Sequence, residues 1–592
     1  MRRKLQLVVL VLIAFAQQDA LAQWTQIGSN INGEAAEDQS GRSVSISGDG
    51  LTIAIGAFVN DGNGTSSGHV RIYKNNNGTW TQQGIDIDGE IASEFFGHQV
   101  SLSNDGLTVA IQAIGNGNGS FGYGIVRVYG YLGGAWAQIG VDIDGEAPDD
   151  GDWSSTVSLS GDGSTVAIGA PYNDGNGWSA GHVRVYKNIN GTWTQQGGDM
   201  DGEAANDLFG TSVALSDDGL TVAVGAPNNT VNGNSSGHVK IFKITNGTWM
   251  QQGSNIDSEA AGDRCGWSVD LSSDGLTVAI SAVGNTVNGT YAANSFAGHV
   301  RVFKNVNGTW TQQGDDMDAD AAGDRFGTKI SLSGDGKIVA IGATVLNTNG
   351  SGYIRVFKNI AGTWTQQGSD VAGDAIGDGQ WLSLGLSNDG LTLVNGAPTV
   401  DDNGTNAGNA RVFEFPYTAV LVTSITVQGQ AGASAITTVG GTLQMDATVL
   451  PANADDATYT WSVTNGTGSA NIDANGLLTA IANGTVTVTA TANDGSGLTG
   501  DAVITLSNQS VGINEQAALA GLSIYPNPAS SQLTINADRK ITSILITDVM
   551  GKTVKTIATP NRTIDVSDLT AGVYLLQVQI NDALVSKRFI KD

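Results

Sequence analysis

The chain has 592 residues and a formal net charge of −28 at pH 7, with 28 Lys and Arg against 56 Asp and Glu. Nucleic acids and anionic membrane surfaces bind basic patches, so this balance argues against both as partners. The length exceeds that of one domain. The single cysteine, Cys265, excludes an intramolecular disulfide and is predicted to be a core residue.

Residues 1–22 are predicted to be a cleaved secretory signal peptide. Arg2, Arg3 and Lys4 form a basic start, residues 5–16 an apolar run, and residues 20–22 an A-x-A cleavage site. An uncleaved membrane anchor is the alternative, but the apolar run is too short to span a bilayer comfortably. No later segment has the length of a membrane-spanning helix, so none is expected after signal removal.

A repeat of 54 to 61 residues organises the chain up to Phe415. The acid of an S-x-D-G turn marks each copy, and a Trp stands 25 or 26 residues before each marker. The seven markers are Asp49, Asp105, Asp162, Asp218, Asp274, Asp335 and Asp389. Within each copy, four short runs alternate with period two and are separated by Asp-Gly and Asn-Gly pairs, which favour tight hairpins.

These repeats predict an all-β fold, with residues 23–417 forming a seven-bladed β-propeller. In the fourth repeat the predicted strands are 211–216, 221–226, 238–243 and 248–252. The second run alternates Val with Ala and Gly, which lets neighbouring sheets approach closely. The chain begins with a fourth-strand sequence at Trp24 and ends its seventh repeat on a third strand. We therefore expect the N-terminal strand to complete the last blade.

The sequence FGTSVALSDDG with VGAP, in residues 209–227, resembles the FG-GAP repeat, the blade motif of integrin α-subunit propellers. The resemblance covers roughly residues 24–415. The calcium loop of the integrin repeats, of D-x-D-x-D-G type, is reduced here to S-D-D-G at residues 216–219, so the family's calcium sites do not carry over.

Residues 420–508 change in character and predict a small β-sandwich. Trp461 has the surroundings of a buried tryptophan, and turn signals recur every ten residues or so. The segment resembles the bacterial Ig-like group 2 domain in residues 441–451, the Trp461-Ser462 pair and residues 472–480. Such domains usually act as spacers or adhesion modules. Residues 509–520 are predicted to be a linker.

Residues 521–592 predict a second small β-sandwich and closely resemble the type A C-terminal sorting domain of the type IX secretion system of Bacteroidota. The resemblance implies export by the type IX translocon, then removal of the domain by its processing peptidase, with release or surface attachment. The matching positions are Tyr525, Pro526, Asn527, Pro528, Gly572, Tyr574 and Lys587.

Acidic loops are predicted to gather on one rim of the propeller. The connection into the first strand of a blade carries D-x-D-G-E-A, and that between the second and third strands carries N-D-G-N-G, and both leave the sheet on the same side. Carboxylates on glycine-containing loops suit calcium, the one cofactor the sequence suggests. The candidate ligands are Asp199, Asp201, Glu203 and Asp207. The alternative is that Asp, Asn and Gly are simply turn residues on a solvated acidic surface.

Four histidines, His69, His182, His238 and His299, recur once per blade at the start of the third strand. They lie too far from the axis to converge, so a repeated structural role is expected. By contrast, aromatic residues vary between blades and could stack on sugar rings or cover the loops' own backbone. The ligand candidates are Phe121, Tyr123, Tyr172, Trp178, Tyr291 and Phe296.

Together these features predict a secreted or cell-surface, non-catalytic binding or adhesion protein for glycan or protein ligands. Two alternatives remain open: a secreted polysaccharide-active enzyme using the acidic rim, and a structural surface-coat protein. A catalytic site should break the repeat with buried carboxylates of shifted pKa. The uniformity of the acidic loops favours binding over catalysis.

Overall fold

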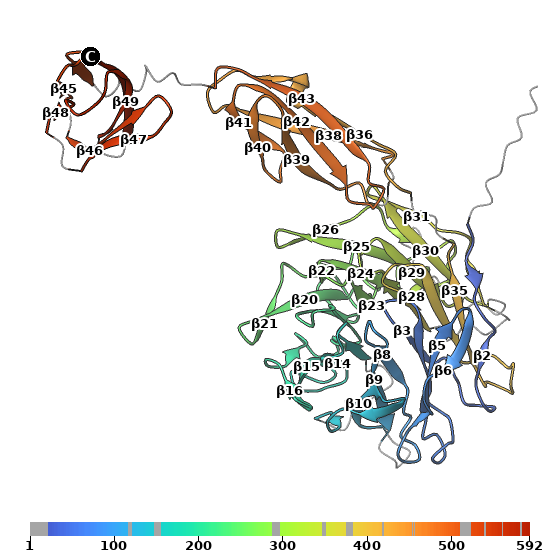
Figure 1. The fold of residues 1–592 in the computed structure, drawn as a ribbon. Coiled ribbons are helices and arrows are strands. Elements are labelled where there is room, and N and C mark those ends of the chain that lie inside the picture. Colours follow the sequence, from blue (N-terminus) through green and yellow to red (C-terminus); the bar gives the residue numbers. More distant parts are fainter. Residues whose placement is uncertain are drawn as a thin grey trace, which may run out of the picture. The chain divides into compact units, whose positions relative to one another are not determined.

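The computed structural model describes residues 22–592 except 116–120, 147–155, 287–295, 346–350, 374–382, 417–419, 453, 455, 510–521, 538–539, 559–560 and 581–582. The chain divides into two compact units, Met1–Tyr417 and Thr418–Asp592, which are described separately (Figure 1). The predicted signal peptide, up to residue 21, and most of the predicted linker lie outside the described residues.

The first unit is built from repeated antiparallel sheets, which we call blades. Blades one to three have the following strands. Blade one holds β3 (Ser43–Ile46), β4 (Thr52–Ala57), β5 (His69–Asn76), β6 (Thr79–Gln82) and β7 (Ile87–Asp88). Blade two holds β8 (Gln99–Leu102), β9 (Thr108–Gly115), β10 (Phe121–Leu132), β11 (Ala135–Gln138) and β12 (Ile143–Asp144). Blade three holds β13 (Thr156–Leu159), β14 (Thr165–Ala170), β15 (His182–Ile189), β16 (Thr192–Gln195) and β17 (Met200–Asp201).

The later blades repeat this plan. Blade four holds β18 (Ser212–Leu215), β19 (Thr221–Ala226), β20 (His238–Thr245), β21 (Thr248–Gln251) and β22 (Ile256–Asp257). Blade five holds β23 (Cys265–Leu271), β24 (Thr277–Ala282), β25 (His299–Val306), β26 (Thr309–Gln312) and β27 (Met317–Asp318). Blade six holds β28 (Phe326–Leu332), β29 (Ile338–Ala343), β30 (Tyr353–Ile360), β31 (Thr363–Gln366) and β32 (Val371–Ala372). Blade seven holds β33 (Ser383–Leu386), β34 (Thr392–Ala397), β35 (Asn409–Glu414), β1 (Thr25–Gln26) and β2 (Ile31–Asn32).

The all-β prediction is confirmed, and within the described residues the blades form a closed ring. Successive innermost strands contact one another from β3 to β33, and β33 contacts β3. These strands lie at the centre of the first unit in Figure 1, with β16, β21 and β26 at its periphery. Each blade also has a short fifth strand, such as β7 or β22, paired with the start of its third strand. The sequence pattern did not predict these two-residue strands.

The ring closes through the N-terminal strand. β1 pairs antiparallel with β35, so that Thr25 lies opposite Glu414. The Trp24 indole N–H donates to the Gln367 carbonyl of blade six at 3.1 Å. The same contact joins other neighbouring blades, for example Trp80 Nε1 to the Ile27 carbonyl at 3.1 Å. An edge strand from the start of the chain thus covers the edge at the end of the repeats.

Glycines of the second strands allow the blades to pack closely. A Cβ atom added to Gly225 in β19 would lie 2.0 Å from the carbonyl oxygen of Gly266 in blade five. Large residues on the same strand fill the space between the sheets, and Val222 and Val224 are completely buried. Cys265 is buried in the core between blades four and five, as predicted.

The second unit begins with a sandwich of two four-stranded sheets. One sheet holds β36 (Ser424–Gly429), β38 (Thr442–Leu450), β41 (Leu477–Ala482) and β40 (Ser469–Ile472). The other holds β37 (Ala435–Ile436), β43 (Thr499–Leu506), β42 (Gly484–Ala492) and β39 (Tyr459–Asn465). A short 3-10 helix, η3, spans Gln430–Gly432. Trp461 is only partly buried and packs against the core between the sheets.

The C-terminal part of the second unit is another two-sheet structure. One sheet holds β44 (Ser523–Tyr525), β45 (Gln532–Asn536) and β48 (Thr563–Asp565). The other holds β47 (Thr553–Ile557), β46 (Ile541–Asp548), β49 (Gly572–Ile580) and β50 (Ala583–Lys591). Its core includes Leu533, Ile546, Leu576 and Phe589, each completely buried.

Candidate functional site

In blades one and three, whose contacts the structure describes, the two acidic loops meet at one rim, as the strand order predicted. The Asn63 side-chain amide, from the loop between β4 and β5, donates to the Gly89 carbonyl of the loop leading to blade two, at 2.9 Å. Asn176 makes the same bond to Gly202 at 2.7 Å. The rim is therefore a fixed framework in which the side-chain amides hold neighbouring loops together.

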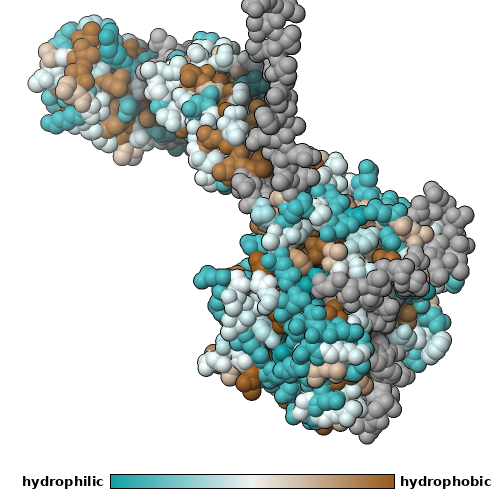
Figure 2. Space-filling model, turned by 90° about the vertical axis from the view of Figure 1, so that its right-hand side faces the viewer, coloured by the Kyte–Doolittle hydropathy of each residue, from teal (hydrophilic) through white to brown (hydrophobic). Residues whose placement is uncertain are grey.

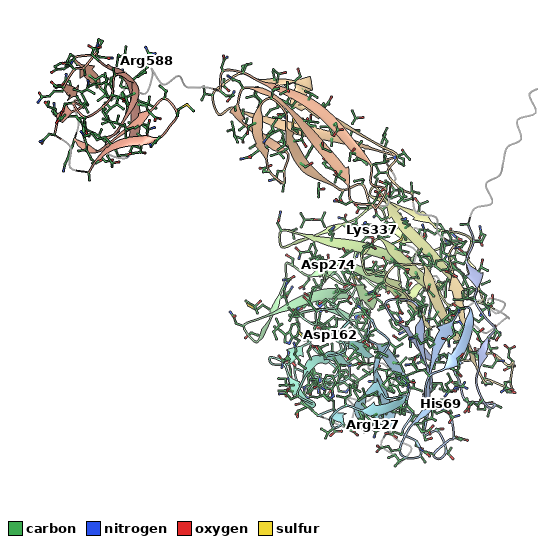
Figure 3. All side chains as sticks on the ribbon, in the orientation of Figure 1. His69, Arg127, Asp162, Asp274, Lys337 and Arg588 are labelled. Carbon is green, nitrogen blue, oxygen red and sulfur yellow. The ribbon has the colours of Figure 1, made fainter. Side chains whose placement is uncertain are left out.

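The carboxylates of this rim are paired with cations from the third strands. Arg127 in β10 lies 2.6 Å from Glu94, 3.2 Å from Glu90 and 3.1 Å from Asp142. Glu90 lies in the loop before blade two and pairs with a cation of the following blade, whereas Asp142 lies in the loop after blade two and pairs with a cation of the preceding blade. These ion pairs link neighbouring blades. Arg127 and His69, another residue of the rim, are labelled in Figure 3. Buried guanidinium groups require such partners.

The same arrangement recurs in blades four and six. The Lys240 ammonium lies 2.5 Å from Glu203 and lowers the pKa of that carboxyl. Arg355 binds Asp320 at 2.6 Å and Asp370 at 2.9 Å, and its hydrogen bonds lower the pKa of Asp320. Sequence reasoning missed the Glu203–Lys240 and Asp320–Arg355 pairs because the two partners lie 37 and 35 residues apart in the chain.

The four calcium candidates have different surroundings. Asp199 lies 3.2 Å from Arg184, and Glu203 is bound to Lys240. Asp207 is buried and accepts hydrogen bonds from the Ala204 N–H at 2.9 Å and the Asn229 amide at 3.0 Å. Asp201 is exposed in β17, opposite His182. Within the described residues, of these four only Asp199 belongs to a group of three potential metal ligands that come together.

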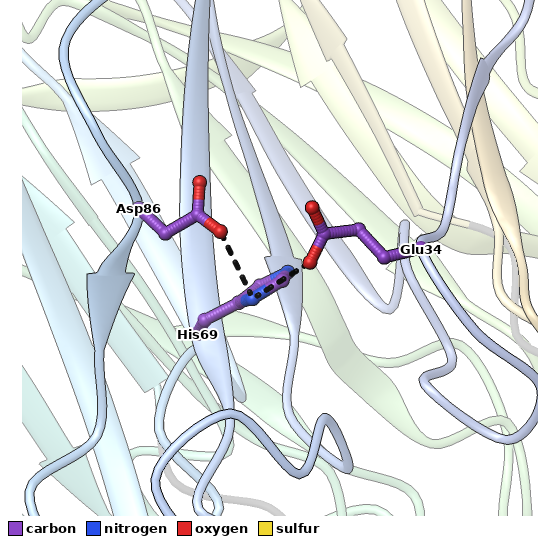
Figure 4. Close-up of side chains that lie close together, drawn as sticks. All are labelled: Glu34, His69 and Asp86. Atoms are coloured by element: carbon purple, nitrogen blue, oxygen red, sulfur yellow. Dashed lines mark ion pairs between the residues drawn. The ribbon is translucent and has the colours of Figure 1, made fainter.

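Three groups of one histidine and two carboxylates do come together at the rim in the described chain: Glu34–His69–Asp86, Glu146–His182–Asp199 and Glu259–His299–Asp316. In the first, His69 Nδ1 lies 3.9 Å from Glu34 and 3.8 Å from Asp86 (Figure 4). Such ligands suit a divalent metal ion. Arg71 lies 3.5 Å from Glu34, however, and already neutralises part of that charge. Burial lowers the pKa of His69 to about 4, so the ring is neutral at pH 7.

One carboxylate departs from the repeat in the way expected of a catalytic acid. Asp270 in β23 stands where other blades have Ser45, Ser101 or Ser158, and burial raises its pKa to about 6. Its oxygens accept hydrogen bonds from the Leu271 N–H at 2.9 Å and the Leu332 N–H of blade six at 2.7 Å. Ser45 accepts the equivalent bond from the Leu102 N–H at 3.0 Å. Asp270 thus takes the place of a serine that joins two blades.

Repeated grooves run between the outer strands of neighbouring blades. The first has a volume of about 370 Å³ and is lined by residues 28–32, Tyr73 and residues 78–80. A second, of about 320 Å³, is lined by residues 253–257, Arg301, Phe303 and residues 308–310. A third, of about 230 Å³, is lined by residues 315–318, Arg355, Phe357, residues 363–364 and Gln366. Each therefore combines a Trp and a second aromatic ring with amide or carboxylate groups.

Family models match three parts of the chain. The FG-GAP repeat matches residues 32–73 and 200–242, the bacterial Ig-like domain (group 2) matches residues 421–503, and the secretion system C-terminal sorting domain matches residues 523–592. The chain therefore contains FG-GAP repeats, an Ig-like domain and a type IX sorting domain. The sorting domain indicates that the protein is secreted or displayed at the cell surface.

Other known proteins resemble only part of the chain. A stretch of 109 residues is 38% identical to the tail tube protein pb6 of Escherichia phage T5, covering 16% of the chain and 23% of the phage protein. Two solved structures are similar over 57% of the chain. They are a putative 6-phosphogluconolactonase from Bacteroides uniformis (86% covered, 16% identity, TM-score 0.39) and a hypothetical selenium-binding protein from Sulfolobus tokodaii (83% covered, 11% identity, TM-score 0.38).

The residues that match the sorting domain differ in burial and in their hydrogen bonds. Tyr574 is buried and donates from its hydroxyl to the Thr570 carbonyl at 2.8 Å. The Asn527 side chain accepts from the Ile590 N–H at 2.8 Å. Gly572 begins β49, and Lys587 lies in β50 opposite Leu576. Tyr525, which precedes Pro526, is 55% exposed. Among the described residues, no helix has the length and apolar character to cross a membrane.

Three of the aromatic ligand candidates, Trp178, Tyr172 and Phe296, have described side chains, and their surroundings differ. Trp178 is 70% exposed, whereas Tyr172 is partly buried. Phe296 lies between Arg264 and Arg325, with its ring centroid 6.0 and 5.7 Å from the two guanidinium carbons. Tyr291 and the side chains of Phe121 and Tyr123 lie outside the described residues.

Proposed function

We propose that this protein is a non-catalytic glycan-binding adhesin of the cell surface, and that its inter-blade grooves are the binding sites. The single observation that carries the proposal is the recurrence of one groove, with the same Trp and polar groups, between several pairs of blades. Aromatic faces beside fixed polar groups suit sugar rings, which present C–H groups on one face and hydroxyls at the edge.

The groove aromatics are rigidly held. Trp310 donates from its indole to the Gln252 carbonyl of blade four at 2.8 Å, and Trp364 donates to the Gln313 carbonyl at 2.6 Å. A Cβ atom at Gly253 would lie 3.0 Å from Trp310 Cδ1, so the glycine allows this close packing. A ring fixed in advance loses little conformational entropy when a ligand stacks on it.

Repetition supports adhesion. Several weak and equivalent sites on one rigid propeller bind a polysaccharide much more tightly than each site binds a single sugar, because successive contacts become intramolecular. The hydrophilic surface of the propeller, seen on one side in Figure 2, is compatible with such polar ligands. In this account the Ig-like domain is a spacer, and the processing peptidase removes the sorting domain after export.

The rim favours binding over catalysis. Glycoside hydrolysis needs two carboxyl groups of different pKa on either side of the substrate. Glu203, Asp320 and Glu94 are instead bound to Lys240, Arg355 and Arg127. Asp270 has a raised pKa, but both of its oxygens accept backbone hydrogen bonds.

Affinity electrophoresis of the full-length protein in gels containing neutral polysaccharides (xylan, laminarin, mannan or dextran) tests the proposal. We expect retardation by at least one of them. The triple variant Thr79→Arg, Thr309→Arg, Thr363→Arg fills the mouths of the three grooves and should abolish it. The matched control, Thr81→Arg, Thr311→Arg, Thr365→Arg, adds the same charge two residues further along each strand, outside the groove linings, and should be retarded like the wild type. Migration unaffected by every polysaccharide, or equal retardation of both variants, would contradict the proposal.

A further inference from the structure

Two cations on the loops into innermost strands differ from the paired third-strand cations of the rim. Arg264 and Arg325 have no carboxylate partner among the described residues. Both are partly exposed. The third-strand cations Arg127 and Arg355, by contrast, each bind two or more carboxylates. In a chain of net charge −28, unneutralised cations at one place require an explanation.

Arg264 and Arg325 occupy the same position in two successive blades. Each is the second residue of the segment that leads into the innermost strand, D-R-C-G in blade five and D-R-F-G in blade six. Both have a left-handed backbone, with φ of 58° and 48°. Glycine adopts this conformation without strain, whereas arginine does so rarely. Other blades have Gln39, Phe95 or Leu208 here, so the side chain varies although the backbone does not.

The acidic neighbours of these arginines point elsewhere. Asp263 is buried and accepts hydrogen bonds from the Ala260 N–H and the Ser258 hydroxyl, both at 2.8 Å. Asp324 accepts from the Ala321 N–H at 3.2 Å and the Tyr353 hydroxyl at 3.1 Å. These carboxylates stabilise the loops, so that no carboxylate of the described part of the chain pairs with the guanidinium groups beside them.

The two guanidinium groups face a small hollow of about 20 Å³, room for about one water molecule, that is lined by Trp267, Val283, Phe296 and Thr328 as well as by the arginines themselves. Both stack on Phe296, at 6.0 and 5.7 Å from its centroid, and Arg264 also lies 5.9 Å from the centroid of Trp267. Stacking holds the planar groups while their N–H edges remain able to donate to an oxyanion. Burial and the nearby charge of Arg264 lower the pKa of Arg325.

Lys329 belongs to a different group of charges. It lies in β28 directly after Thr328 of the hollow, and successive side chains of a strand point to opposite faces. Burial and the charge of Arg42 in blade one lower its pKa to about 8. Arg42 and Lys329 in turn both lower the pKa of His98 in blade two. The arginines of the hollow therefore form a pair of their own.

We infer that the two stacked arginines, Arg264 and Arg325, bind the carboxylate or sulfate groups of an acidic glycan. The planar guanidinium fork matches both oxyanions in bidentate geometry. The partly exposed rings of Trp267 and Phe296 beside the arginines offer faces on which the sugar ring that carries the anion can stack. The site is separate from the inter-blade grooves and does not depend on them.

Affinity electrophoresis of the full-length protein with four probes tests this inference. Alginate carries carboxylates, dextran sulfate carries sulfates, dextran is neutral, and poly-L-glutamate is an acidic peptide. We expect at least one acidic polysaccharide to bind, with a dissociation constant that rises steeply with salt. The double variant Arg264→Gly, Arg325→Gly should weaken this binding at least about tenfold, since each guanidinium–oxyanion pair is a charge-assisted hydrogen bond.

Several comparisons make the result decisive. The glycine variant keeps the left-handed backbone, so its thermal midpoint should equal or exceed that of the wild type. The double variant Arg264→Gln, Arg325→Gln has the same net charge as the glycine variant and provides an independent test. Lys337→Ala removes a cation from an S-x-D-G turn at the opposite rim and should not change binding. If alginate alone binds, the ligand class is carboxylated, and if dextran sulfate alone binds, it is sulfated. Equal binding of wild type and both double variants, binding of neither polysaccharide, or tighter binding of poly-L-glutamate would overturn the inference.

Discussion

The backbone N–H of Asn388 donates to the carbonyl oxygen of Gly48 at 3.0 Å, although 340 residues separate them. Gly48 donates in turn to Asn104, and one residue from each S-x-D-G turn continues the series through Gly161, Asp217, Ser273 and Gly334 back to Asn388. Within the described residues, seven hydrogen bonds of 2.8 to 3.1 Å thus form a closed ring at the rim opposite the acidic loops. The turns therefore join all blades, beyond reversing the chain within each.

Close packing between blades should depend on glycine at the second strand. We expect Gly225→Ala to destabilise the propeller by about 2 to 4 kcal/mol, because the new methyl group would lie 2.0 Å from the Gly266 carbonyl oxygen. Gly198→Ala is the matched control, since no atom lies within 4 Å of its added Cβ. Urea denaturation measures both. Equal stability of the two variants would show that the blades can separate without cost.

Closure of the ring should depend on Trp24. Trp24→Ala removes the hydrogen bond to Gln367 and the contact with Phe415, whose ring centroid lies 5.3 Å away. We expect a loss of about 2 to 3 kcal/mol for this half-buried side chain. Trp178→Ala, at a site 70% exposed, should change stability by less than about 0.5 kcal/mol. A Trp24 variant as stable as the Trp178 variant would mean that the N-terminal strand does not secure the last blade.

The sequence predicted the parts of the fold that are local. Four alternating runs and the S-x-D-G turns located the strands, and the displaced Trp24 indicated the pairing of β1 with β35. The two-residue fifth strands were missed because Ile256–Asp257 is too short to show a period. The ion pairs of the rim were missed because Glu203 and Lys240 meet only when the chain has folded.

Two deviations from the repeat are visible in the sequence. Asp270 replaces an uncharged residue, serine in most other blades, and Arg264 and Arg325 replace uncharged residues at one position of the loop into the innermost strand. Comparison of blades at each position would have found them. Their surroundings could not have been predicted, because burial of Asp270 and stacking on Phe296 depend on contacts between blades.

Asp270 should make the propeller less stable at neutral pH. Burial raises its pKa from 3.8 to about 6, so the folded protein holds this proton more tightly than the unfolded chain. Its contribution is therefore favourable below about pH 4 and is lost as pH rises through about 6. Asp270→Ser restores the serine of other blades and should stabilise the propeller by about 1 to 2 kcal/mol at pH 7.5, with a smaller difference at pH 4.

Calorimetry of the propeller transition across this pH range measures the effect. The reciprocal variant Ser45→Asp places the same acid at the equivalent site of blade one, and it should introduce a pH dependence of the same sign. A stability difference between Asp270→Ser and the wild type that does not change from pH 4 to pH 7.5 would rule out this role for the carboxyl group.

Calcium should not stabilise the propeller. The acidic rim already contains Lys240 beside Glu203 and Arg184 beside Asp199, so a calcium ion would have to displace these cations. We expect the thermal midpoint in millimolar calcium to stay within about 1 °C of that in EDTA. A midpoint that increases with the logarithm of calcium concentration would instead support a metal site at the rim.

The stoichiometry of glycan binding tests the central claim most directly. Isothermal titration of the full-length protein with an oligosaccharide of the neutral polysaccharide that retards it should give more than one equivalent weak site per chain, because the groove recurs around the propeller. The triple groove variant should lose at least three of these sites. A single site per chain, or continuing heat from cleavage of the oligosaccharide, would contradict the account of a multivalent, non-catalytic adhesin.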